Sequence, residues 1–501
     1  MELYDSLILG FGTALTPTNI LFCFIGVVLG TLIGVLPGIG PHATIAMLLP
    51  VTITLEPTTA LIMLAGIYYG AQYGGSTTAI LINLPGEAAS AVTALDGYQM
   101  AKDGRAGSAL AVAALASLFA GTVATFVIAL FAPILTIAAL QFGAAEYFSL
   151  MVLGLVASVA LAQQSVLKAI AMIMMGLLLG IIGTDIYTGA WRFTFGIHQL
   201  ADGINVVPVA IGLYGVAEIL RNLGERQTKP AEVREVGRLM PSRTEAKRSV
   251  GPAVRGTVIG SLLGVLPGGG ALLSSFASYA MEKRLSKSPE RFGKGAIEGV
   301  AGPEAANNAG AQTSFIPMLT LGIPGNAVTA MMIGALIIQG IVPGPNIISE
   351  QPTMFWGLIA SMWIGNLMLV ILNLPLIGIW VRVVVAPYYL VFPAVMIFSA
   401  IGCYSIANNS LDVIWISVFA ALGYLFYRLE CEPTPFILGF ILGPMMEEHL
   451  RRAMMFSRGD PTTFFSSPIS LVELLAAAAL LVVLSLPSVS SKRKKVFVEE
   501  S

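Results

Sequence analysis

The sequence predicts an all-α polytopic membrane protein with about ten to twelve transmembrane helices. First, 56% of its 501 residues are hydrophobic and 11% are charged, whereas soluble globular proteins carry about 25% charge. Second, several apolar runs approach or reach the roughly 20 residues that span a bilayer as a helix. Third, one Gly- and Pro-rich segment occurs twice, each time in apolar surroundings. Short strands of alternating polarity, which a membrane barrel requires, are not visible.

The repeated segment predicts two broken membrane helices. Residues 30–40 read GTLIGVLPGIG and residues 260–270 read GSLLGVLPGGG, with eight of eleven positions identical. Proline lacks the backbone donor and glycine favours a turn, so each Pro-Gly-x-Gly motif should interrupt its helix. Matching helix breaks in the two halves of a membrane chain are typical of the binding site of a secondary transporter.

Basic residues are concentrated in three regions. Residues 224–255 hold eight Lys and Arg, residues 283–294 hold five and residues 492–495 hold four, together 17 of the 27. Cytoplasmic loops collect Lys and Arg, so we expect these regions and the Lys102/Arg105 turn to be cytoplasmic. A basic tail that binds lipid headgroups would also be cytoplasmic.

The crossings are expected to follow from this distribution. Four spans are predicted between Lys102 and the first basic region, so the chain returns to the cytoplasm and 185–199 falls outside. These spans are 107–131, 146–162, 166–184 and 206–223.

The second repeat is expected to form a re-entrant hairpin. Gly256–Met281 is apolar and has basic sequence at both ends, so two half-helices of ~11–13 residues should enter from the cytoplasm and return. The first repeat has no basic flank, which suits the opposite face. We therefore predict two inverted-topology repeats, each with a hairpin. The expected domains are 1–223 and 253–460 as repeats, 224–252 as a basic linker, and 461–501 as a final helix and tail.

A second matched element follows each hairpin. Gly74–Thr78 precedes Leu84–Glu87 in the first half, and Asn307–Ser314 precedes Gly322–Asn326 in the second, each with another Pro-Gly step. One such step alone is equally consistent with a packing kink, because Gly and Pro are common in membrane helices. Four breaks in two corresponding pairs favour a functional site.

These motifs resemble a known family. YYGAQYGGSTTAILINLPGE (residues 68–87), GVLPGIGP, GVLPGGG and NNAGAQTSFIPMLTLGIPGN (residues 307–326) are similar to the large membrane subunit of the tripartite tricarboxylate transporters, the TctA family. The resemblance covers roughly residues 15–455. It implies a subunit in the bacterial inner membrane that works with a small integral membrane subunit (TctB-like) and a periplasmic solute-binding protein (TctC-like). It also implies import of carboxylates by means of an ion gradient.

Other function classes lack their sequence signals. The chain has no G-x-x-x-x-G-K-[ST] phosphate loop, no nucleophile elbow and no H-E-x-x-H pair. We therefore expect no enzyme activity, no cofactor and no nucleic-acid partner, with Na⁺ or H⁺ as the coupling ion. The histidines form no metal-ligand pair, and the cysteines (Cys23, Cys403 and Cys431) suggest small buried hydrophobes. A stand-alone ion-coupled organic anion transporter and a passive channel remain as alternatives.

The expected site residues lie at the helix breaks. Half-helix N-termini offer unpaired N–H groups and partial positive charge to a carboxylate, and hydroxyls can add to them. The expected substrate-binding residues are Pro37, Gly38, Gly40, Pro267, Gly268, Gly269, Gly270, Ser274, Ser76, Thr77 and Thr78. Turn carbonyls and amides can hold a cation, for which we expect Asn83, Pro85, Gly86, Thr313, Gly322, Pro324, Gly325 and Asn326. Ser and Thr in membrane helices are, however, more often hydrogen-bond partners between helices than ligands.

Carboxylates within membrane segments are functional hypotheses by default. Glu304 is one, and Glu87 is either a helix cap or a coupling group. Asp96, Asp103 and Glu298 are expected to be solvated near cytoplasmic ends. The side of residues 430–460 and the identity of the carboxylate stay open: citrate, other di- or tricarboxylates and aromatic acids are all compatible.

Overall fold

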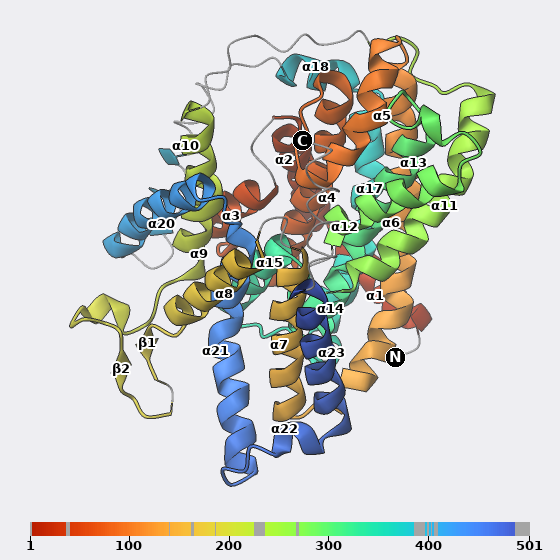
Figure 1. Cartoon of the computed structure of the whole chain (residues 1–501). Helices are drawn as coiled ribbons and strands as arrows, with labels where there is room; N and C mark the ends of the chain where they lie inside the picture. Colours follow the sequence, from red (N-terminus) through yellow and green to blue (C-terminus); the bar gives the residue numbers. More distant parts are fainter. Residues whose placement is uncertain are drawn as a thin grey trace.

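The protein is described by a computed structural model (Figure 1). It describes residues 3–36, 41–139, 141–161, 165–185, 187–224, 236–266, 270–384, 396–397, 400–401, 403–404 and 409–485. Apart from a two-stranded antiparallel pair, β1 and β2, the elements of this part are helices. The prediction of an all-α fold is confirmed.

The helices of the first half precede the basic linker. They are α1 (Leu3–Ala14), α2 (Pro17–Val35), α3 (Pro41–Thr52), α4 (Pro57–Ile82), η1 (Ala88–Ser90), α5 (Ala91–Lys102), α6 (Ala106–Ala139), α7 (Ala144–Leu161), α8 (Val166–Gly180), η2 (His198–Leu200), α9 (Val206–Ala210), the π-helical η3 (Ile211–Val216) and α10 (Ala217–Gly224), with the strands β1 (Gly183–Thr184) and β2 (Trp191–Arg192).

The second half has a similar succession of helices. They are α11 (Arg243–Gly264), α12 (Gly270–Leu285), η4 (Pro289–Arg291), α13 (Glu298–Thr313), α14 (Phe315–Thr320), α15 (Ala327–Ile338), α16 (Ile347–Glu350), α17 (Pro352–Asn373), α18 (Ile377–Val384), α20 (Ser410–Arg428), α21 (Pro433–Phe456), α22 (Thr463–Ser466) and α23 (Pro468–Ser485).

Several helices have the composition of membrane spans. Within the described residues, α2, α6, α17 and α20 are long and apolar enough to cross a membrane, and shorter apolar helices lie within α7, α8, α15 and α23. The chain is therefore a multi-pass membrane protein. The count of ten to twelve crossings stays a prediction, because helices such as α13 carry too many polar residues to be recognised by composition.

Both predicted helix breaks are present. α2 ends at Val35 and α3 begins at Pro41, while α11 ends at Gly264 and α12 begins at Gly270. The limbs of the second hairpin are longer than predicted, with 22 and 16 residues. Arg255 of α11 donates to Glu282 of α12 at 2.7 and 2.6 Å, so the two limbs return to the same end of the molecule.

The same glycine stripe packs a helix pair in each half. Glycines of α2 and of α11 lie against backbone carbonyls of α4 and α13, where a Cβ would come within 2.2–2.5 Å of the carbonyl oxygen. The pairs are Gly26, Gly30 and Gly34 with Met63, Ile67 and Ala71, and Gly256, Gly260 and Gly264 with Gly302, Ala306 and Gly310. Residue numbers rise together in both sets, so each pair is parallel, and small residues permit its close approach.

Where the two halves meet, α4 of the first half and α13 of the second half run in opposite directions. The Gln72 amide of α4 lies 2.8 Å from Asn307 Oδ1 of α13, whereas Ser76 of α4 bonds to Glu304 of α13. Numbers that rise along α4 fall along its partner, so α4 and α13 are antiparallel. An inverted repeat requires such an arrangement; the orientation of the two hairpins in the membrane remains a prediction, as do the domain boundaries. In space the halves interlock, because α6 packs on α11 and α13, and α17 packs on α4.

The described parts of the first two basic regions converge with the Arg105 turn on one end of the molecule, whereas the third region, residues 492–495, lies outside the described residues. Arg105 bonds to Glu245 at 3.0 Å, and Arg248 and Arg291 both bond to Glu298. Burial alone would raise the pKa of Glu245, but hydrogen bonds from Ser242, Arg105 and Ser108 lower it to about 2. The Arg105 turn, the start of α11 and the loop after α12 therefore form one charged face.

Asp96 corrects one expectation. It is fully buried rather than solvated, and its Oδ1 accepts the backbone N–H groups of Gly293, Gly295 and Ala296 at 2.8–2.9 Å. Its Oδ2 accepts the Tyr279 hydroxyl at 3.0 Å. The carboxylate of α5 thereby holds the loop between η4 and α13 in the other half. Asp103, by contrast, is exposed as expected.

The side of the membrane on which residues 430–460 lie was left open by the sequence, and the structure places these residues relative to other elements. Arg192 of β2 bonds to Glu447 of α21 at 2.6 Å, and Arg451 bonds to Asp185 at 3.0 Å. The C-terminal part of α21 therefore lies on the same face as Asp185 and β2, at the opposite end from α5 (Figure 1).

Cysteine labelling tests this arrangement. In a cysteine-free background, Lys247→Cys and Lys287→Cys should both react with an impermeant maleimide from the cytoplasm only, because both limbs of the second hairpin start at the basic face. Both lysines are exposed. Phe195→Cys, at an 86% exposed position near β2, should react only from the periplasm. Labelling of positions 247 and 287 from opposite sides would contradict the hairpin.

Candidate functional site

Each half has a later helix break besides its hairpin turn. In the first half this break is the Pro85-Gly86 step, called here the first break, and its backbone lies in very close contact with α2. α4 ends in Asn83, which has a left-handed φ of 58°, and the Pro85-Gly86 step follows. A Cβ on Gly86 would lie 1.9 Å from the carbonyl oxygen of Gly34 in α2, so only glycine fits there. Of the predicted cation residues, Gly86 is thus buried in the hairpin contact, whereas Asn83 and Pro85 are exposed.

The second break is the Pro324-Gly325 step of the other half, and it lies beside α11 as the first break lies beside α2. Gly325 lies near Gly264, and a Cβ there would be 3.3 Å from Ser314. Gly322 has a φ of +69°, which favours glycine. Asn326 caps α15, since its side chain accepts the Thr329 N–H at 3.0 Å.

Two helix N-termini adjoin at this second break. α12 begins at Gly270, and a Cβ on Gly270 would lie 3.3 Å from the Asn326 amide nitrogen at the start of α15. The same amide donates to the Tyr68 hydroxyl of the first half at 3.1 Å. Predicted substrate residue Gly270 and predicted cation residue Asn326 are therefore neighbours, and the division between the two sets stays a prediction.

Two carboxylates, the buried Glu304 and the half-buried Glu87, occupy the contact between the halves. Glu304 of α13 is 1% exposed and accepts Ser76 of α4 at 2.8 Å and the Thr93 hydroxyl of α5. Glu87 accepts the Asn307 amide of α13 at 3.0 Å. Glu87 stands at the N-cap position of η1, close to the backbone N–H groups of Ala89 and Ser90, and it also has a partner across the interface, so both alternatives, a helix cap and a coupling group, stay open.

Amide groups complete this cluster. With its nitrogen facing the carboxylate, the Gln72 amide lies 2.6 Å from Glu87 Oε1. Asn308 donates to Ser117 of α6 at 2.6 Å. Sequence reasoning assigned no role to Gln72, Thr93 or Ser117. Gln72 stands inside the first quoted motif and was open to recognition, whereas Thr93 and Ser117 stand in unremarkable sequence.

The other predicted hydroxyls mostly bond within their own helices. Thr77, Thr78, Ser274 and Thr313 each donate to a backbone carbonyl about one turn earlier, at 2.7–3.2 Å. The alternative that we weighed was hydrogen bonding between helices, and of these four only Thr78 and Thr313 also reach a carbonyl of a neighbouring helix, that of Gly34 at 3.5 Å and that of Gly260 at 3.4 Å. Their oxygen lone pairs are still able to accept a hydrogen bond or a cation.

Six predicted residues fall outside the described part of the chain. They are Pro37, Gly38, Gly40, Pro267, Gly268 and Gly269, at the two hairpin turns. Their role in substrate binding stays a prediction.

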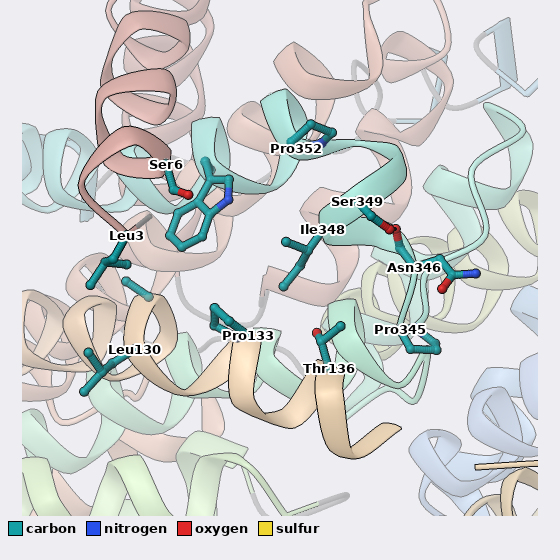
Figure 2. A pocket seen from close by; sticks show the side chains of 12 residues that line it. Leu3, Ser6, Leu130, Pro133, Thr136, Pro345, Asn346, Ile348, Ser349 and Pro352 are labelled. Carbon is teal, nitrogen blue, oxygen red and sulfur yellow. The ribbon is translucent and has the colours of Figure 1, made fainter. Parts of the chain in front are cut away.

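One pocket of the structure lies away from the predicted site residues. About 570 Å³ in volume, it is bounded by α1, the C-terminal part of α6 and the segment around α16, with Leu3, Leu130, Pro133 and Ile348 among its mainly apolar lining (Figure 2). None of the predicted site residues lines it, so it does not form part of the candidate site.

Comparison with known proteins identifies the family. The sequence pattern of the tripartite tricarboxylate transporter TctA family matches residues 20–438. The chain belongs to the TctA family. The match includes both hairpins, both later breaks and both carboxylates. As a TctA-family protein, the chain is a transporter subunit of a tripartite system rather than an enzyme.

Two relatives come from Agrobacterium vitis. One, described as "Uncharacterized 52.8 kDa protein in TAR-I ttuC' 3'region", is 63% identical over 500 residues, which cover 100% of both chains. Another, "Uncharacterized protein in TAR-II ttuC' 3'region", is 63% identical over 242 residues, or 48% of this TctA-family chain and 100% of the relative. No solved structure matches the chain significantly.

Proposed function

We propose that the chain is the large transmembrane subunit of a cation-gradient-driven importer of carboxylates that depends on a periplasmic solute-binding protein. The observation that carries this proposal is the meeting of helix breaks and of the carboxylates Glu87 and Glu304 where α4 of the first half and α13 of the second half run antiparallel. The TctA-family match supports it, as does the lack of a phosphate loop in the sequence.

The helix N-termini supply the chemistry for an anionic substrate. The N-terminal ends of α12 and α15, with their partial positive charge, meet near Gly270 and Asn326, and the Asn326 cap already takes up the Thr329 N–H of α15. The Ser274 hydroxyl belongs to α12, and the Ser314 hydroxyl lies 3.5 Å from the Asn326 amide at the start of α15. A carboxylate is bound there by hydrogen-bond donors without any Lys or Arg.

Membrane potential supplies the reason for cation coupling. A potential of 100 mV, negative inside, opposes entry of each negative charge by about 2.3 kcal/mol, roughly fifty-fold in the equilibrium distribution. Co-entry of Na⁺ or H⁺ offsets this cost. The proposed partners are a small TctB-like membrane subunit and a TctC-like binding protein, in the bacterial inner membrane with the basic face in the cytoplasm.

Reconstitution tests the proposal. Proteoliposomes that contain this chain, the small subunit and the binding protein should take up one or more of a panel of labelled di- and tricarboxylates only under an imposed Na⁺ or H⁺ gradient. Omitting either partner should lower the initial rate by at least about ten-fold, since the site has weak intrinsic affinity without a basic residue. Full-rate uptake by the chain alone without a gradient would contradict both the coupling and the tripartite assembly.

A further inference from the structure

A small internal cavity lies beside Glu304 at the contact between the two halves. Its volume is about 10 Å³, which is room for one water molecule or one ion of similar size. The polar lining comes from four helices: Tyr73, Ser76 and Thr77 of α4, Ser117 of α6, Glu304 of α13 and Asn373 at the end of α17.

Two oxygen atoms of the lining residues have no hydrogen-bond partner among the described residues. They are the Tyr73 hydroxyl and Asn373 Oδ1, and each residue is 4% exposed. The Asn373 Nδ2 donates to the Leu369 carbonyl at 2.9 Å, so the amide oxygen is the free end. Buried polar atoms are nearly always paired, and two unpaired oxygens at one cavity point to a polar guest.

The negative charge of the Glu304 side chain favours a cation in the cavity. Among the described lining residues Glu304 is the sole carboxylate, and it accepts hydrogen bonds from the neutral hydroxyls of Ser76 and Thr93. None of the ion pairs in the described part of the chain includes Glu304. A carboxylate buried in the membrane without a cation is costly.

The ligand chemistry selects the kind of cation. The potential ligands are carboxylate, hydroxyl, phenol and amide oxygens, which suit hard ions. A single carboxylate neutralises one positive charge and would leave a divalent ion unbalanced. The described residues also contain no group of three or more His, Cys, Asp or Glu able to hold a metal ion.

We propose that this cavity is a Na⁺ site, with Glu304, Ser76, Tyr73 and Asn373 as its oxygen ligands. The proposal rests on the cation-coupled function proposed above, and it names the ion and its place. It differs from the cation residues expected from sequence, which lie at the Pro-Gly breaks. Because α4 and α6 belong to the first half and α13 and α17 to the second, a bound ion bridges both halves. Movement of α13 against α4 then makes or breaks the site together with the nearby Glu87–Asn307 contact.

Thermal unfolding of the purified full-length chain measures binding apart from transport. Tm is followed against NaCl concentration, with choline chloride and KCl at equal ionic strength as references. We expect Na⁺ to raise the Tm of the wild type specifically. Tyr73→Phe should raise the Na⁺ concentration for half-maximal stabilisation by about ten-fold, since it removes one ligand oxygen, and Glu304→Gln should abolish the effect.

Tyr69→Phe is the matched control. The Tyr69 hydroxyl is also buried and unpartnered, but it does not line the cavity, so this variant should respond to Na⁺ like the wild type. Tyr73→Phe breaks no hydrogen bond of the Tyr73 hydroxyl within the described part of the chain, so it remains informative if Glu304→Gln fails to fold.

Three results would overturn the site. Equal Tm values in Na⁺ and choline mean that the cavity holds water, and a Tm that follows pH instead of Na⁺ means a proton site. Undiminished Na⁺ stabilisation in Glu304→Gln means that Na⁺ binds elsewhere, even where uptake needs a Na⁺ gradient. Uptake without any ion gradient, combined with Glu304-dependent Na⁺ stabilisation, would instead refute the proposed coupling and leave the site intact.

Discussion

Gly86→Ala is expected to lower carboxylate uptake by the reconstituted complex at least about ten-fold and to destabilise the chain by on the order of 3 kcal/mol. The added methyl group would lie 1.9 Å from the Gly34 carbonyl oxygen and 2.7 Å from Gly75, both backbone atoms that have no free space to move. The first break must then separate from α2. Initial uptake rates and size-exclusion profiles of the purified variant measure the two effects.

Gly325→Ala is the matched variant in the other half. Its Cβ would be 3.3 Å from the Cβ of Ser314 and 3.7 Å from the Gly264 oxygen, so a shift of a few tenths of an ångström accommodates it. We expect this variant to keep most of the wild-type uptake. Equal damage from both substitutions would mean that the two breaks are equally tight, and normal uptake by Gly86→Ala would show that the first break is mere packing.

Asp96→Ala is expected to lower the Tm of the purified chain by about 5 °C or more. The substitution removes the acceptor shared by the Tyr279 hydroxyl and three backbone N–H groups, of which that of Ala296 is buried and the other two are partly buried. Unsatisfied buried donors cost roughly 1–3 kcal/mol each. Since this carboxylate joins α5 to the loop before α13, the contact between the halves weakens as a unit.

Asp103→Ala provides the comparison at the end of the same helix. Asp103 is exposed and lies 3.9 Å from Arg105, and such surface ion pairs contribute little. Its Tm should stay within about 1 °C of the wild type. An unchanged Tm for Asp96→Ala would mean that the loop finds other acceptors and that Asp96 does not join the two halves.

The two glycine stripes explain how one local pattern serves both halves. Gly30 and Gly260 occupy corresponding positions of the repeated segment, and each lies against a carbonyl of the following parallel helix. The later breaks keep the same relation, with Gly86 beside Gly34 and Gly325 beside Gly264. Glu87 directly follows the Pro85-Gly86 step, and Asn326 directly follows the Pro324-Gly325 step. The second half therefore has no carboxylate at this position, and Asn326 caps α15.

The sequence by itself determined what depends on local chemistry. Apolar length predicts the helices, Pro and Gly predict the breaks after Val35 and Gly264, and the distribution of Lys and Arg predicts the shared basic face. These properties act over a few residues, or over the whole chain as a composition, so they are readable without coordinates.

Only the tertiary structure decided which polar groups meet. Ser76 and Thr93 reach Glu304 from 228 and 211 residues away, and no local pattern records such a pairing. Asp96 looked solvated because it stands near charged sequence, yet backbone donors of the other half enclose it. The physical reason is that a membrane interior forces each buried polar group to find a partner, and antiparallel packing of the two halves determines which partner lies within reach.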